Sequence, residues 1–154
     1  MSSPNFNLLD CTLRDGGYYN NWNFSKKNIQ KYISDINSTG IKYIELGFRF
    51  NEKRKIKGLT AYTEYSLLNS LKIPKNLTIG IMINASDLIK KNNLEIKELK
   101  KLVSEKNLSK IKFVRFACHY KEIFFLKDCI DYLNKLKLKV FINIMQISEI
   151  KTNQ

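Results

Sequence analysis

Residues 8–17 read Leu8-Leu9-Asp10-Cys11-Thr12-Leu13-Arg14-Asp15-Gly16-Gly17, an apolar run followed by a charged pair and two glycines. The apolar run, from Phe6 to Cys11, predicts a first β-strand, and the glycine pair predicts a break after it. Arg14 and Asp15 then lie at the carboxyl end of this strand, where parallel α/β proteins form their active sites. From the residue types alone, the pair is either a functional site or an ordinary surface ion pair in a glycine turn.

The rest of the chain alternates between strand-like and helix-like segments. We predict strands at 42–46, 77–83, 111–117 and 139–144, and helices from Ser25 to Gly40, at 64–71, at 87–105 and around 126–136. Strands rich in Ile, Val and Phe, separated by amphipathic helices, indicate a parallel sheet covered by helices. An open doubly wound sheet could be complete with five strands, whereas a TIM barrel needs eight strands and ~250 residues. The pattern alone leaves both open.

Composition and charge argue against membrane, secreted and nucleic-acid-binding proteins. The chain has 154 residues, of which 44% are hydrophobic, so we predict one folded domain. It contains no apolar run long enough to span a membrane and no signal-peptide pattern, and its three cysteines lack a CxxC spacing. We therefore expect a cytoplasmic protein with reduced thiols and no membrane partner. The net charge of +13 is nearly all lysine and is spread along the chain, so we do not expect nucleic-acid binding.

An adjacent Arg and Asp have a clear chemical use together. A carboxylate such as that of Asp15 can hold a divalent metal ion. A guanidinium such as that of Arg14 can bind a substrate carbonyl oxygen and the enolate that develops from it.

The segment Asp10-Cys11-Thr12-Leu13-Arg14-Asp15-Gly16 resembles the D-x-T-L-R-D-G signature of a family of metal-dependent lyases and aldolases. That family is related to hydroxymethylglutaryl-CoA lyase, homocitrate and isopropylmalate synthases and 4-hydroxy-2-oxovalerate aldolase. The likeness is closest to the aldolase-like branch linked to bacterial surface-polysaccharide biosynthesis. It continues through 44–49, 114–119 and 143–145, and so covers essentially the whole chain.

The resemblance implies a TIM (β/α)8 barrel, of which this chain supplies about the first five strands. Residues 1–154 would be the N-terminal part of a single aldolase-type barrel domain, incomplete at its C-terminus. Arg14 would be catalytic and bind the enolate of the substrate. Asp15 would be a metal ligand, and Glu45 would lie near the same ion.

Four further residues take roles from the same resemblance. His119 matches a histidine that the aldolases carry after their fourth strand, and the alternative is a histidine packed at a strand end. Arg49 and Asn143 fall inside the matched stretches and are candidate substrate-binding residues. Tyr18 stands where the aldolases place a histidine thought to be the acid/base. A phenol has an ordinary pKa of ~10, which must be lowered for that role.

The chain also departs from the family. The family completes its metal site with an H-x-H pair on the seventh strand, whereas this chain has a single His. We therefore expect either a fragment or a natural truncation that holds Mg²⁺ or Mn²⁺ only weakly. Two open sheet edges predict self-association or pairing with a missing C-terminal half.

The implied function is that of a metal-dependent carbon–carbon lyase of the aldolase type. It would cut a 4-hydroxy-2-oxo acid to pyruvate and an aldehyde, and we expect the 154-residue chain alone to be inactive. One alternative is Claisen condensation of an acyl-CoA with a 2-oxo acid. Another is a non-catalytic half-barrel that needs a partner chain. The basic run from Lys53 to Lys57 would attract an anionic substrate, such as a phosphate or a nucleotide-linked sugar, or be a solvated loop.

Overall fold

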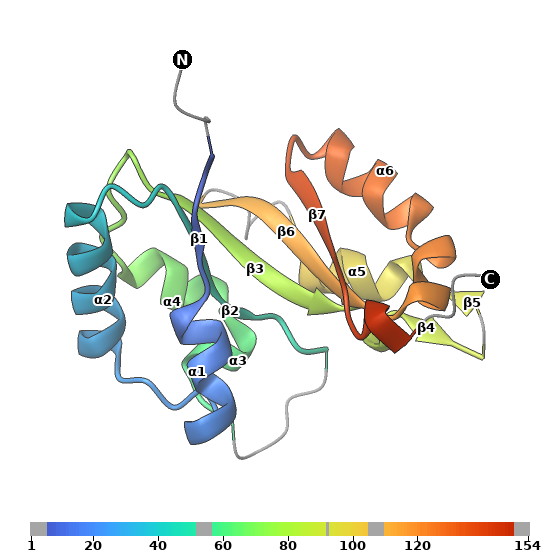
Figure 1. Ribbon diagram of the computed structural model, residues 1–154, viewed down its shortest axis with the longest axis horizontal. Coiled ribbons are helices and arrows are strands. Elements are labelled where there is room, and N and C mark those ends of the chain that lie inside the picture. The colour runs from blue at the N-terminus through green and yellow to red at the C-terminus, as the bar shows by residue number, and fades with distance from the viewer. Residues whose placement is uncertain (1–5, 52–56, 92, 105–109, 150–154) are drawn as a thin grey trace.

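The computed structural model describes residues 6–51, 57–91, 93–104 and 110–149. Its main sheet contains five parallel strands in the order β1-β2-β3-β6-β7. These strands are β1 (Leu9–Asp10), β2 (Tyr43–Phe48), β3 (Thr78–Asn84), β6 (Ile111–Cys118) and β7 (Lys139–Ile144). Each strand pairs with the one that precedes it in the sheet along the chain, and Figure 1 shows this progression from blue to red.

The strand order separates the two architectures. A doubly wound sheet reverses its strand order and so places its first strand inside the sheet. Here β1 and β7 are the two edges of the sheet and the order never reverses within the described residues. This is the order of consecutive strands in a barrel wall. Closure into an eight-stranded barrel stays a prediction.

Helices cover one face of the sheet. They are α1 (Thr12–Asn20), α2 (Lys26–Ser38), α3 (Leu59–Tyr62), α4 (Tyr65–Ser70), α5 (Ile96–Leu102) and α6 (Lys127–Lys135), with short 3₁₀ turns η1 (Ala85–Asp87), η3 (Tyr120–Phe125) and η4 (Ile147–Glu149). Alternate strand residues such as Ile44, Ile81 and Val114 pack in one apolar core with Ile33 of α2 and Leu133 of α6. In Figure 1, α2 and α6 lie at opposite sides of the molecule.

The opposite face of the sheet, here called the inner face, carries Tyr43, Glu45, Phe113, Arg115 and Phe141. Strand alternation puts these side chains on the side away from the helix-covered core. Residues from both sheet edges, among them Leu9 of β1 and Phe141 of β7, line one hollow of about 520 Å³ on this face. Edges that share a hollow require a curved sheet, so the five strands form a partial barrel wall.

The predicted strands agree with the structure to within a few residues, but the helix predicted at 87–105 is wrong in its first half. There the chain forms η1 and an antiparallel hairpin of β4 (Ile89–Lys90) and β5 (Asn93–Leu94). Lys91 has a φ of 49°, and the Glu95 N–H closes the hairpin on the Leu88 carbonyl at 2.7 Å. A lysine- and asparagine-rich turn favours this geometry over a helix. Helix α5 keeps the predicted apolar stripe, because Leu99 and Leu102 are buried.

Helix α1 runs through the glycine pair that was predicted to end the first strand with a break. Gly17 is buried under the indole of Trp22, and a Cβ at this position would overlap that ring. Gly16 is different, because its Cβ would meet only the Phe24 ring at 3.6 Å. Gly17 is therefore required for close packing against Trp22, whereas Gly16 is not.

Neighbouring glycines on α1 give a matched stability test. We expect Gly17→Ala to lower the free energy of unfolding by about 1–3 kcal/mol, because the new methyl group forces Trp22 out of place. Gly16→Ala should leave stability unchanged or raise it by up to ~1 kcal/mol, since alanine favours a helix. Urea unfolding followed by Trp22 fluorescence measures both. Equal effects of the two variants would contradict this account of Gly17.

Within the described residues, no helix has the length and apolar character needed to cross a bilayer.

Candidate functional site

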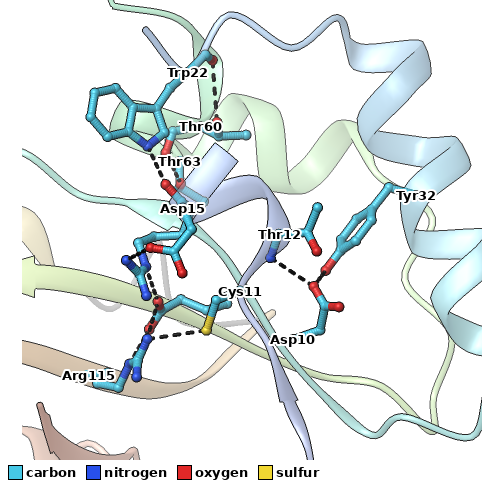
Figure 2. Close-up of polar contacts among 11 residues, drawn as sticks. Asp10, Cys11, Thr12, Asp15, Trp22, Tyr32, Thr60, Thr63 and Arg115 are labelled. Atoms are coloured by element: carbon cyan, nitrogen blue, oxygen red, sulfur yellow. Dashed lines mark hydrogen bonds and ion pairs between the residues drawn. The ribbon is translucent and has the colours of Figure 1, made fainter. Parts of the chain in front are cut away.

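The site begins where β1 passes into α1. The Asp10 carboxylate accepts hydrogen bonds from the backbone N–H of Thr12 at 2.8 Å and from the Tyr32 hydroxyl of α2 (Figure 2). Burial, reinforced by the bond to Asp10, raises the pKa of the Tyr32 phenol, so it stays protonated and keeps donating. The Trp22 indole N–H donates to the Arg14 carbonyl at 2.9 Å. These contacts fix the first turn of α1, which carries Arg14 and Asp15.

A fully buried carboxylate lies at the centre of the site. Glu45 of β2 has 0% exposure and accepts from Arg14 Nε through Oε1 at 2.7 Å. Arg115 of β6 donates to both Glu45 oxygens at 2.8 Å, through Nε to Oε2 and Nη2 to Oε1. The strand between them, β3, places Gly80 opposite Glu45. The Phe113 ring fills the space beside Gly80, where a Cβ would overlap it, and Arg115, which is opposite Met82, reaches across β3 to Glu45.

The charges of this cluster balance locally. Arg14 also pairs with Asp15, so two guanidiniums face two carboxylates. Burial by itself would lower the pKa of Arg115, but the hydrogen bonds to Glu45 together with the nearby negative charges, that of Glu45 first, outweigh burial and raise the pKa. Arg115 Nη2 also contacts Cys11 Sγ at 3.2 Å (Figure 2). Burial, with the negative charge of Glu45, raises the pKa of the Cys11 thiol, so Cys11 is neutral at pH 7.

Tyr18 lies one helical turn after Arg14 on α1, and both border the same aromatic group. The Arg14 guanidinium carbon lies 5.9 Å from the centre of the Phe48 ring, and the Tyr18 ring lies 6.1 Å from it. Tyr18 also makes an edge contact with Trp22 at 4.9 Å. Its side chain is 63% exposed and faces solvent beside Arg14. The structure therefore brings Arg14, Asp15, Tyr18 and Glu45 together, and their catalytic and metal-binding roles stay predictions.

Arg49 lies outside this cluster. It is buried, and its guanidinium donates to the backbone carbonyls of Leu102, at 2.6 Å, and Thr63. Burial lowers its pKa to about 10, which leaves it charged at pH 7. These contacts tie the carboxyl end of β2 to α5 and to the α3–α4 turn. They give Arg49 a structural use, and its role in substrate binding stays a prediction.

His119 follows β6 and Asn143 lies on β7, and among the described residues no hydrogen bond or ion pair joins either of them to the Arg14 cluster. His119 is exposed at the carboxyl end of β6, and its backbone N–H donates to Glu122 Oε2 at 2.8 Å. Asn143 lies on β7 opposite Ala117, and its carbonyl accepts weakly from Cys118 Sγ at 3.9 Å. Their proposed roles therefore stay predictions.

Asp15 and Glu45 do not by themselves make a metal site. Both Glu45 oxygens are already bonded to guanidiniums, and Asp15 is paired with Arg14. The part of the chain that the structure describes contains no group of three or more His, Cys, Asp or Glu side chains placed to hold an ion. A divalent ion at this rim needs further ligands, and Asp15, whose side chain is 61% exposed, is the carboxylate best placed to join them.

Two known proteins that are similar to this chain carry the names of a decarboxylase and an aldolase. Over 78 residues it is 27% identical to the oxaloacetate decarboxylase of Mycobacterium tuberculosis (strain ATCC 25618 / H37Rv), a match covering 49% of this chain and 23% of that protein. The crystal structure of the N-terminal domain of a proposed aldolase from Bacteroides vulgatus matches with a TM-score of 0.75 and 28% identity, over 94% of this chain and 46% of that one. No protein-family model matches the chain.

These likenesses relate the chain to aldolase- and lyase-type enzymes. They also match its five-stranded parallel sheet to the partial barrel of an aldolase domain. The chain spans less than half the length of either of these two proteins.

Sequence reasoning assigned no role to Arg115, although its signal was visible. An arginine stands in the middle of the apolar strand segment 111–117, and Glu45 stands in the equally apolar segment 42–46. A charged residue inside a buried strand needs a partner of opposite charge. Glu45 and Arg115 point to the same face of the sheet, from strands separated by β3 alone, and the structure pairs them.

Removing the central carboxylate tests how much the fold depends on it. We expect Glu45→Gln to lower the free energy of unfolding by about 3–5 kcal/mol, because two partly buried guanidiniums lose the charge of their fully buried partner. The matched control is Asp35→Asn, which breaks the exposed Lys31–Asp35 pair on α2 and should cost less than ~1 kcal/mol. Urea unfolding of both variants makes the comparison. A loss for Glu45→Gln as small as that of the control would show that the network does not support the fold.

Proposed function

We propose that the chain, residues 1–154, is the N-terminal part of an aldolase-type barrel. The complete barrel would cleave the C3–C4 bond of a 2-oxo acid. The observation that supports this most is the Arg14 guanidinium. It is held just after β1 by Glu45 and Asp15, beside an exposed tyrosine. The favoured substrate is a 4-hydroxy-2-oxo acid, and its products are pyruvate and an aldehyde.

The C3–C4 bond of the substrate breaks, its electron pair forms the enolate of pyruvate, and a base takes the proton of the C4 hydroxyl as the aldehyde forms. Arg14 donates to the 2-oxo oxygen and stabilises the negative charge that develops there. Tyr18 is the candidate for the proton transfer, because it lies beside Arg14 and is open to solvent. Protonation of C3 then completes pyruvate.

Decarboxylation is the second candidate, and the similarity to an oxaloacetate decarboxylase favours it. Loss of CO₂ from oxaloacetate leaves the same pyruvate enolate, so the same arginine serves both reactions. Metal dependence, with Mn²⁺ or Mg²⁺, and a role in surface-polysaccharide biosynthesis belong to this proposal and rest on the sequence resemblance. The ion's other ligands would come from beyond the residues that the structure describes.

Substitution of Arg14 in the complete barrel tests the proposal. Arg14→Ala should lower the rate of pyruvate formation about 10²–10³-fold, which is the effect of losing one oxyanion donor. Lys31→Ala, a surface change on α2, is the control and should keep full activity. Deuterium exchange of the pyruvate methyl protons, followed by NMR, reports enolate formation directly. The 154-residue chain alone should show no exchange. Full pyruvate-forming activity in Arg14→Ala would overturn the role of Arg14.

The edge strand β7 leads to a separate prediction about self-association of the chain. Phe141 and Ile144 of β7 are partly exposed, and β7 pairs on one side only among the described strands. A backbone edge beside apolar side chains favours pairing with another strand. We expect the 154-residue chain to dimerise or aggregate, and to do so more at higher salt because screening weakens the repulsion of its +13 charge. Sedimentation at two salt concentrations tests this. A compact monomer at every concentration would contradict it.

A further inference from the structure

A second cavity lies at the same rim of the sheet as Arg14, and the proposed chemistry does not use it. The cavity has a volume of about 320 Å³ and is lined by Phe50, Asn51, Lys57, Asn84, Ser86, Asp87 and Lys90. Asn84 is the last residue of β3, and Phe50 follows the end of β2. The pocket, here called the rim pocket, therefore opens where parallel α/β proteins bind their substrates.

The lining of the rim pocket favours a negatively charged ligand. Lys57, Lys90 and the carboxylate of Asp87 line the pocket, and the Glu98 carboxylate lies behind Asn51, within reach of the Lys90 charge. The Asn84 amide and the Ser86 hydroxyl also line it, whereas Asn51 Nδ2 already donates to Glu98 and to the Asp87 carbonyl. Amides and hydroxyls can donate hydrogen bonds to oxyanions. The overall charge of +13 strengthens the attraction of any anion that enters.

Lys57 is held in place before any ligand arrives. Its ammonium lies 4.2 Å from the centre of the Trp22 ring and 4.3 Å from that of Phe50. Cation–π contacts on two rings limit the movement of a long side chain, so less conformational entropy is lost when an anion binds. Asn51 is also fixed, because its Nδ2 donates to Glu98 Oε2 at 3.1 Å.

The rim pocket adjoins the Arg14 site through two aromatic rings. Phe50, which lines the pocket, stacks on Phe48 at 4.5 Å, and Phe48 lies under the Arg14 guanidinium. A substrate whose 2-oxo group reaches Arg14 can therefore extend its far end toward Lys57.

We infer that the rim pocket binds an anionic, oxygen-rich group, a phosphate or a carboxylate, on the aldehyde part of the substrate. This inference rests on the proposed function for the identity of the substrate. The anion site itself is testable without any catalysis.

The chain carries its own reporter for this site. Trp22 is the only tryptophan in the sequence, and the ammonium of Lys57 lies over its ring. An anion that draws Lys57 away from the indole should change the fluorescence of Trp22. We expect inorganic phosphate, added to the 154-residue chain at constant ionic strength set with NaCl, to give a saturable change. A parallel titration with succinate tells whether the site prefers a phosphate or a carboxylate.

Matched lysine variants separate the pocket from general charge. Lys90→Gln should weaken phosphate binding about fivefold, the effect of removing one charge close to the anion. Lys127→Gln removes the same charge from an 82%-exposed side chain on α6 and should bind phosphate like the wild type. Lys57→Gln should also weaken binding, which NMR chemical shifts of the pocket residues can follow when the indole signal changes.

Clear outcomes overturn the inference. It is wrong if neither phosphate nor succinate gives a saturable change, if Lys90→Gln binds like the wild type, or if Lys127→Gln weakens binding as much as Lys90→Gln. Failure of the proposed function is a different result: Arg14→Ala would then keep full pyruvate-forming activity in the complete barrel, whereas the phosphate titration of the 154-residue chain does not depend on that activity.

Discussion

The buried carboxylate of Glu45 is the interaction on which the site depends. It accepts hydrogen bonds from Arg14, which follows β1, and from Arg115 on β6, and so ties both to its own strand, β2. A buried carboxylate without these partners would carry a large desolvation cost. A partly buried guanidinium without Glu45 would also be left as an uncompensated charge. The three charges therefore require one another. Because β3 lies between β2 and β6 in the sheet, the bonds from Arg115 to Glu45 connect two strands that are not direct neighbours.

The sequence predicted most of the elements of the fold, because alternating apolar strands and amphipathic helices leave a clear periodic signal. It could not predict α1, since two glycines read as a break, while the reason for Gly17 is an indole that packs on it from Trp22. The hairpin at 89–94 was missed for a related reason. Residues 87–105 contain neither glycine nor proline to mark a turn, and the backbone bond from Glu95 to Leu88 that closes the hairpin leaves no signal in the sequence.

The candidate site was predicted in part. Arg14, Asp15 and Tyr18 lie on α1, which follows β1, and Glu45 lies on the neighbouring strand β2. The order of elements along a sequence can indicate such a neighbourhood. Arg49 is also at a strand end, yet its side chain turns to the carbonyls of Thr63 and Leu102, and only the packing of α5 decides that direction. For the same reason the sequence showed a basic run after β2 but not the cavity beside Lys57. Residues 53–56 of that run lie outside the described residues, and Lys57 alone is placed by the structure.

The order of strands in the sheet has a consequence for how the protein is made. Each strand of the main sheet pairs with the strand that precedes it in that sheet along the chain, from β1 to β7. A ribosome releases the chain in the same order, so every new strand finds its partner already synthesised. No strand has to wait for a later one, and no long loop has to close across the sheet. The curved wall with Glu45 and both of its arginines is complete once β6 has emerged, and the growing edge of the sheet is then the template on which the next strand folds during translation.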